Sequence, residues 1–442
     1  MSESRKKYRG DSSFPFFIIK MNLLIINAAI LTQNKRRRHI PHGFIVVRKD
    51  KIDKVSSGDP KPNDFKSGYK VINAKNLIVL PGFVNAHVHL GESIFQGLLK
   101  GKYSLEDYLK VTEEITRKTD LVEKERKIVA DYSLLHLMKA GTTTICGGRV
   151  AGFANKWRIR NVSGYMVMNS SKLKALSIGL ERQYTREYKK NKKISISYPA
   201  IFLHSLNKID MAAMSSVKKI LKSFPDVRLV LHIAETKNQE REIEEELGMS
   251  SVEFLEKNNL LNRRTILIHG NWFSQNDLSL IKKRQSSIVQ CLSSNINVAD
   301  KVLNLNDVIG IGIKVCLATD GVATSGTFSI LEEARRCFSY YKNSISQQKC
   351  LDLITIDAAK VLGLNNTIGS IEKNKKADLF FVKNNKRDDG DLFQNIGEIY
   401  GVMVDGGFKI WDSELLENDE SGIINKFNLL VVKIKELIIN NN

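Results

Sequence analysis

The sequence predicts an α/β protein, namely a (β/α)₈ barrel joined to a small β-sandwich domain that the N- and C-terminal segments build together. Three observations predict this fold. Eight short apolar segments alternate with helical segments in the middle of the chain, which is the pattern of parallel βα units. Strand-like segments without helices lie on both sides of this region. The 442 residues suffice for a barrel of about 250 residues and a smaller second domain.

The first part of the chain is expected to hold an extension over residues 1–19 and then short strands. These strands are predicted at residues 23–26, 43–47 and 71–72, with turn residues between them. Strand character returns after the barrel, at residues 369–372, 377–382 and 401–404. We therefore assign residues 20–78 and 368–412 to one composite sandwich domain.

The barrel is predicted to occupy residues 79–367. Its eight strands are expected at residues 78–85, 143–146, 164–168, 194–203, 228–233, 265–269, 287–291 and 314–319. Helices are expected at residues 113–139, 212–222, 239–247 and 330–341, and a further helix at 355–364 with Thr355 as its N-cap. In such a barrel, functional side chains lie at the C-terminal ends of the strands.

The last segment, residues 413–442, is predicted to form an amphipathic helix. Its apolar residues recur at helical spacing, at Phe427, Leu430, Val431, Ile434, Leu437 and Ile438. We expect this face to pack on its own fold or on a second copy of the chain, which would form a homodimer, rather than on a membrane.

The composition indicates a cytoplasmic protein, and its expected partner is a small-molecule substrate. Lys and Arg outnumber Asp and Glu by 68 to 48, but only residues 35–38 form a dense basic run, so no nucleic-acid partner is expected. No apolar run is long enough to span a bilayer, so no membrane partner is expected. The five cysteines have no CxxC spacing, which argues against a disulfide framework and a thiolate zinc site.

Four predicted barrel strands end in residues that ligate metals. His87 and His89 are two residues apart on a strand, so that both side chains point to one face. His232 and His269 each end an apolar strand, and Asp320 follows another. Glu235, three residues after His232, is a candidate acid/base beside a metal-activated water. Chance would scatter these residue types over helices and loops, so their common position predicts a metal site.

These motifs resemble the amidohydrolase superfamily over residues 22–405. The segment from Pro81 to His89 is similar to that family's first barrel strand, His232-Ile233-Ala234-Glu235 to its fifth, His269 to its sixth and Asp320 to its eighth. Leu203-His204-Ser205 and Cys291-Leu292-Ser293-Ser294-Asn295 resemble the fourth and seventh strands of one branch. That branch holds S-adenosylhomocysteine and methylthioadenosine deaminases, guanine deaminases and triazine chlorohydrolases.

The resemblance implies one divalent metal ion per chain, Zn²⁺ in the first place and Fe²⁺ in the second. The implied ligands are His87, His89, His232 and Asp320. Glu235 would be the general acid/base, and His269 would orient the attacking water. Binuclear branches carry a carboxylated lysine on the fourth strand, and residues 200–204 contain no lysine.

The resemblance further implies a deaminase of a nitrogen-rich ring, of the purine or purine nucleoside type. Substrate contacts are expected from His204, Arg149, Glu92 and Gln96. The alternatives are removal of chloride or an alkylamine from a triazine, and opening of a cyclic amide, on the same site. A basic barrel that binds nucleic acid is a non-enzymatic alternative, and the complete metal set argues against it. The segment after His89 departs from the branch pattern, which leaves the substrate open.

Overall fold

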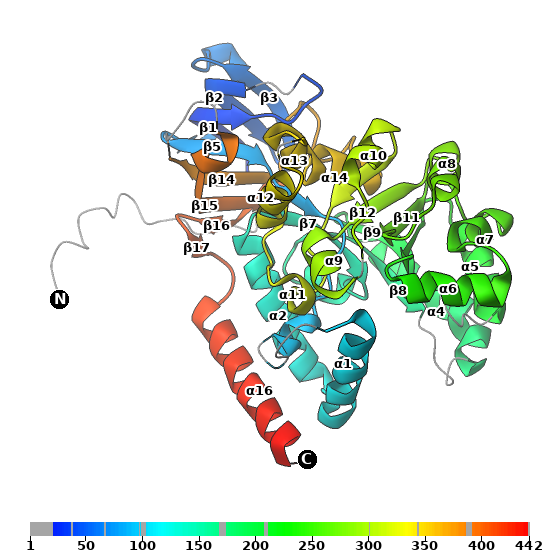
Figure 1. Cartoon of the computed structure of the whole chain (residues 1–442). Coiled ribbons are helices and arrows are strands. Elements are labelled where there is room, and N and C mark those ends of the chain that lie inside the picture. Colours follow the sequence, from blue (N-terminus) through cyan, green and yellow to red (C-terminus); the bar gives the residue numbers. More distant parts are fainter. Residues whose placement is uncertain are drawn as a thin grey trace.

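The computed structural model describes residues 21–36, 39–65, 68–96, 98, 103–167, 174–206, 211–299, 301–342, 344–385 and 391–440. The extension expected over residues 1–19 lies outside this part of the chain, as do Arg37 and Arg38 of the basic run and Met168 of the third predicted strand. Figure 1 shows a barrel surrounded by helices, with a separate β domain beside it.

Eight parallel strands form the barrel, and they neighbour one another in chain order. They are β6 (Phe83–Asn85), β7 (Thr142–Gly148), β8 (Arg160–Val167), β9 (Ser197–Leu203), β10 (Arg228–Ile233), β11 (Thr265–His269), β12 (Ser287–Gln290) and β13 (Lys314–Leu317). Alternate residues of one strand pack in different cores: Ile266 lies in the inner cluster and Leu267 in the outer cluster, under the helices. The predicted fold class is confirmed.

The barrel closes between its first and last strands through a side chain. Beyond β6 and β13, a single parallel bridge joins Val88 to Asp320. Just below it, Asn85 donates from Nδ2 to Thr319 Oγ1 at 2.7 Å and accepts at Oδ1 from the Thr319 backbone N–H at 3.1 Å. Asn85 is fully buried. Its amide therefore adds a side-chain link next to the backbone bridge, and we call the contact between Asn85 and Thr319 the Asn85 seam.

Both ends of the chain contribute to the β domain, which is one hydrogen-bonded sheet of nine strands. Its strands are β1 (Leu23–Leu31), β2 (His39–Arg48), β3 (Lys51–Ser57), β4 (Lys70–Asn73), β5 (Leu77–Pro81), β14 (Leu379–Asn384), β15 (Ile396–Val404), β16 (Gly407–Trp411) and β17 (Glu414–Leu415). β5 joins the two halves, because it pairs parallel with β1 and antiparallel with β14. Side chains from both halves enclose one apolar core.

The structure corrects the predicted boundaries of this domain. The predicted strand 78–85 is two strands, because the chain leaves the β sheet after Pro81 and enters the barrel at Phe83. Gly82 permits the crossing: a Cβ there would lie 2.3 Å from the Thr143 side chain. The predicted strand 369–372 is not a strand, since only one of its backbone N–H groups, that of Ile371, donates to a carbonyl of the β domain, that of Thr32. β3, β16 and β17 were not predicted, and β17 extends the sheet to Leu415.

Two predicted helices differ from the structure. The predicted helix 113–139 covers the second half of α1 (Leu105–Thr119) and all of α2 (Glu123–Lys139), and the two are separated where Asp120 adopts a left-handed φ of 37°. Thr355 does not cap α14 (Ile356–Val361) with its side chain, because its hydroxyl donates to the Leu351 carbonyl of the preceding helix. α5 (Met211–Ser223), α6 (Lys237–Leu247) and α12 (Ile330–Tyr340) lie within two residues of their predicted bounds.

The remaining helical segments connect the strands. They are η2 (Pro62–Asp64), η3 (Glu92–Phe95), α3 (Ala151–Ala154), α4 (Lys174–Asn191), α7 (Ser251–Lys257), α8 (Gln275–Arg284), α9 (Leu292–Val298), α10 (Leu305–Gly310), α11 (Val322–Ser325), α13 (Gln347–Leu353) and α15 (Leu392–Asn395).

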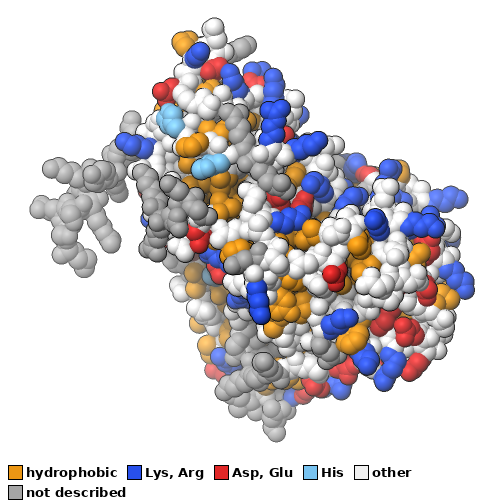
Figure 2. All heavy atoms as spheres, turned by 45° about the horizontal axis from the view of Figure 1, so that its top comes forward, with side chains coloured by type: hydrophobic (Ala, Val, Ile, Leu, Met, Phe, Trp, Pro, Cys, Tyr) orange, Lys and Arg blue, Asp and Glu red, His pale blue; other side chains and the backbone are white. Residues whose placement is uncertain are grey.

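The C-terminal helix α16 (Glu420–Asn440) packs on its own fold, beside α2 and α1 (Figure 1). Phe427, Leu430 and Ile434 are buried in this contact, and the Phe427 ring stacks on Tyr132 with centroids 3.7 Å apart. The helix begins at Glu420 rather than at residue 413. Of the helices in the described ranges, none is long and apolar enough to cross a membrane. Figure 2 shows Lys and Arg side chains scattered over one face of the molecule among acidic ones.

Candidate active site

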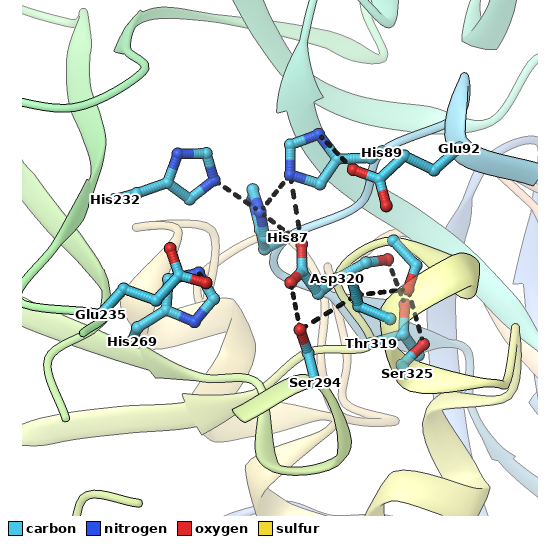
Figure 3. Close-up of polar contacts among 12 residues, drawn as sticks. His87, His89, Glu92, His232, Glu235, His269, Ser294, Thr319, Asp320 and Ser325 are labelled. Carbon is cyan, nitrogen blue, oxygen red and sulfur yellow. Dashed lines mark hydrogen bonds and ion pairs between the residues drawn. The ribbon is translucent and has the colours of Figure 1, made fainter. Parts of the chain in front are cut away.

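Four side chains from three strand ends converge on one point, as Figure 3 shows. His87 Nε2 lies 2.9 Å from His89 Nε2 and 3.1 Å from His232 Nε2. Asp320 Oδ1 lies 3.1 Å from His87 Nε2 and 3.2 Å from His89 Nε2. The Val88–Asp320 bridge of the barrel seam holds the first and eighth strands at this spacing. The structure therefore brings together the four side chains that were expected to be metal ligands.

The donor set fits one divalent cation. Ligand atoms about 2.0–2.1 Å from a tetrahedral ion are about 3.3 Å apart, close to the separations found here. His232 donates from Nδ1 to the His204 carbonyl at 2.6 Å, which leaves its Nε2 lone pair for a metal. His269, Cys291 and Asp320 also lie close together, but burial raises the pKa of the Cys291 thiol well above its ordinary value, so that it stays protonated and is a poor ligand.

The electrostatics of this cluster favour positive charge. Burial lowers the pKa of His87 to about 4 and that of His232 well below its ordinary value, so both imidazoles are neutral, as metal ligands must be. Burial also lowers the pKa of His89, but the carboxylates of Glu92 and Asp320 outweigh burial and raise it to about 9. A cation at this point is therefore stabilised by the surrounding carboxylates.

Glu235 and His269 lie beside the ligand cluster. Ala234 takes a left-handed φ of 47°, which turns the chain after β10 and brings Glu235 back to the site. Glu235 Oε1 lies 3.6 Å from His269 Nε2, and both side chains are buried. Burial raises the pKa of Glu235, as suits a group that takes and returns a proton. His269 and Asp320 also have left-handed φ values, of 73° and 61°, where the chain turns after their strands.

The first turn of α9 holds two of these groups through consecutive residues. Ser294 donates from Oγ to Asp320 Oδ2 at 2.7 Å. Asn295 Oδ1 lies 2.8 Å from His269 Nδ1. Both residues belong to the segment after β12 that carries the family resemblance. α9 therefore positions the carboxylate of one strand end and the imidazole of another.

A cavity of about 400 Å³ opens onto the cluster, which is within the usual range for small-molecule sites. His204 and Glu92, two of the expected substrate contacts, line it. Burial raises the pKa of Glu92 to about 7, and Tyr108 of α1 donates its hydroxyl to Glu92 Oε2 at 2.8 Å. Tyr108 was not identified in the sequence, because it lies at core spacing on an amphipathic helix.

α1 and α6 form opposite walls of this cavity. Asn238 of α6 donates from Nδ2 to Glu106 Oε1 of α1 at 2.6 Å, which links the two walls. No motif marks this contact, because its partners are 132 residues apart in the sequence.

The other two expected contacts lie elsewhere. Arg149 follows β7 with a left-handed φ of 59°, and its guanidinium lies over the Tyr165 ring, 5.7 Å from the centroid. It lines a separate cavity beside α4. Gln96 ends η3 and is exposed, outside the lining of the site. Neither residue lines the cavity beside the ligand cluster, so substrate contacts from Arg149 and Gln96 are not part of the proposal below.

A barrel with metal-ligand side chains at its strand ends, and with a β domain built from both ends of the chain, defines a class of metal-dependent barrel hydrolases. The chain belongs to the amidohydrolase family, whose sequence model matches residues 78–408. This membership confirms the resemblance that the motifs indicate.

Similar proteins agree with this membership. The chain is 27% identical over 435 residues to a 5-methylthioadenosine/S-adenosylhomocysteine deaminase of Clostridium tetani, a match that covers 92% of this chain and 98% of that one. An adenosine deaminase from Xanthomonas campestris, solved with bound zinc, has a TM-score of 0.83 at 18% identity, covering 94% and 99% of the two chains. Atrazine chlorohydrolase from Arthrobacter aurescens, complexed with zinc, has a TM-score of 0.84 at 17% identity, covering 92% and 100%. These two structures show that the fold is shared.

Proposed function

We propose that this protein is a metal-dependent aminohydrolase that deaminates a purine or a purine nucleoside. The observation that carries the proposal is the convergence of three imidazole Nε2 atoms and one carboxylate oxygen beside Glu235. The names of the similar proteins, which include methylthioadenosine and adenosine deaminases, support a substrate of this class.

His87, His89, His232 and Asp320 would hold one zinc ion, with Fe²⁺ as the second candidate. Such an ion supplies Lewis-acid stabilisation of developing negative charge and lowers the pKa of a water molecule towards about 7. A single ion is favoured because β9 offers no lysine for a second metal.

The protein's own groups move the proton. Glu235 takes a proton from the water that attacks the ring carbon bearing the amino group, and His269 orients that water. Glu235 then returns the proton to the ring nitrogen. The proton of the added hydroxyl group moves to the amino group, the carbon–nitrogen bond to that group breaks, and ammonia leaves as the ring carbonyl forms. His204 and Glu92 line the cavity where the substrate would lie.

Ammonia release, with elemental analysis of the same zinc-loaded sample, tests this proposal. The panel holds adenosine, methylthioadenosine, S-adenosylhomocysteine, guanine, cytosine and chloro- and alkylamino-triazines. We expect about one zinc per chain and ammonia from an adenosine-type substrate. Release of chloride or alkylamine instead would overturn the deaminase and favour the triazine reaction, and a protein without bound metal would overturn the site.

A matched pair of variants tests the role of Glu235. Glu235→Gln should keep its zinc and lose turnover by about 10²–10⁴-fold, because it removes the proton carrier. Glu244→Gln removes the same charge from an exposed position on α6 and should leave turnover unchanged. Full activity in Glu235→Gln would contradict the assignment.

A further inference from the structure

A buried hydrogen-bond network lies behind His269, on the side away from the cavity. It contains Asn271, Gln290 and Asn295, whose side chains are all fully buried, and the backbone of Leu303. A backbone N–H can only donate and a backbone carbonyl can only accept. Backbone contacts therefore determine which way each side-chain amide in the network points.

Two backbone groups orient Asn271. The Leu303 N–H donates to Asn271 Oδ1 at 3.2 Å, and Asn271 Nδ2 donates to the Glu235 carbonyl at 3.1 Å. Gln290 is oriented independently, because its Nε2 donates to the Leu303 carbonyl at 3.2 Å. If either amide were turned round, it would place two donors or two acceptors against each other.

These anchors orient Asn295. Its Nδ2 lies 3.0 Å from Asn271 Oδ1 and 3.1 Å from Gln290 Oε1, and both of these oxygens accept. A reversed Asn295 amide would put its oxygen against two oxygens, at the cost of two buried hydrogen bonds. Asn295 Oδ1 must therefore face His269, 2.8 Å from Nδ1.

We propose that Asn271 and Gln290 are positioning residues that fix the tautomer of His269, through Asn295, with the proton on Nδ1. An amide oxygen accepts only, so His269 Nδ1 carries the proton, and in that neutral tautomer the lone pair is at Nε2. That nitrogen faces Glu235 at 3.6 Å, in the cavity. Resting on the proposed function, His269 accepts a hydrogen bond from the attacking water and so directs the other lone pairs of that water towards the substrate.

The test reads the tautomer directly. Zinc-loaded protein labelled with ¹⁵N-histidine is studied by long-range ¹H–¹⁵N spectroscopy, and His269→Gln identifies the His269 signals by their loss. We expect a protonated Nδ1 and an unprotonated Nε2. A protonated Nε2 in the wild-type protein would overturn the proposal without any variant, and it would do so whether or not a substrate has been found.

A double variant tests the anchors. Asn271→Leu with Gln290→Met removes both orienting contacts, so a Nε2-protonated population of His269 should appear. The value of kcat should fall about ten-fold or more, with zinc content and KM little changed. Asn276→Leu, at an exposed asparagine, is the matched control. An unchanged His269 tautomer in the double variant would overturn the role of the anchors. If the double variant does not fold, the His269 tautomer is measured in Gln290→Met alone, with the same two outcomes.

A rescue variant separates positioning from packing. Asn295→Asp in the double-variant background places an oxygen that can only accept opposite Nδ1, so the original tautomer and most of kcat should return. Tautomer recovery without recovery of kcat would refute the catalytic part of the proposal. A wild-type protein with the expected tautomer but no turnover on any substrate would refute the proposed function alone.

Discussion

Glu333 is a buried carboxyl group whose replacement should stabilise the protein in a pH-dependent way. It lies on α12 behind the site and has no exposed surface. Its Oε2 accepts from the Ser293 N–H at 3.2 Å. Its Oε1 has no hydrogen-bond partner among the described residues, and the nearest cation, Arg336, is 3.9 Å away. Burial raises the pKa of Glu333 to about 7.

The size of this effect on the free energy of unfolding follows from the coupling between folding and proton binding at Glu333. The pKa of Glu333 rises from its ordinary value of 4.5 to about 7, so the folded state holds the proton more tightly than the unfolded chain does. The contribution of Glu333 to the free energy of unfolding is therefore most favourable below pH 4.5. It falls as the pH rises from 4.5 to about 7 and stays low at higher pH. The penalty is about 1 kcal/mol at pH 5.5 and about 3 kcal/mol at pH 8.5.

Glu333→Gln removes this titration, so its advantage over the wild-type protein should grow by about 2 kcal/mol between pH 5.5 and pH 8.5. For a chain of this length that corresponds to about 2 °C in Tm. Scanning calorimetry of the zinc-loaded proteins at both pH values measures it, with the exposed Glu244→Gln as control. A difference in Tm that is the same at both pH values would refute the reasoning.

Three other changes have defined outcomes. His87→Ala should reduce zinc to well below one ion per chain by elemental analysis, while His42→Ala in the β domain keeps it; equal content in both would contradict the ligand assignment. Arg160→Met leaves Asp378, which now pairs with Arg160 at 2.7 and 2.9 Å in a buried site, without its partner. It should cost about 3–5 kcal/mol of unfolding free energy in urea, and a loss below about 1 kcal/mol would argue against a buried ion pair. Asn85→Leu opens the Asn85 seam beside two of the ligands, so zinc affinity measured against a competing chelator should fall about ten-fold; unchanged affinity would show that the seam closes without it.

The strand ends were predictable because two local signals coincide there. A period of two sets the face of a strand, and the C-terminal ends of parallel strands meet on one side of a barrel. His232 and Asp320 could thus be placed without knowing any loop. Arg149 could not, because the direction of its side chain depends on a left-handed turn that no local pattern specifies.

Contacts between distant segments were not predictable for a different reason. Tyr108 reaches Glu92 only because α1 lies over the site, and its spacing on the helix is that of a core residue. The division of residues 78–85 at Gly82 was hidden as well, since both halves are equally apolar. In each case the local sequence was compatible with two structures, and packing against distant segments determined which one forms.

The pairing of β5 with β14 also sets an order of events during synthesis. About 300 residues separate the two strands, and a ribosome adds about 5–20 residues each second, so β5 waits about 15–60 s for its partner. During this interval one edge of the nascent sheet has unpaired backbone groups, which can join to another chain. The barrel is made within the same interval. We therefore expect ribosome-bound chains that stop before Leu379 to associate with one another more readily than chains that extend past Asn384.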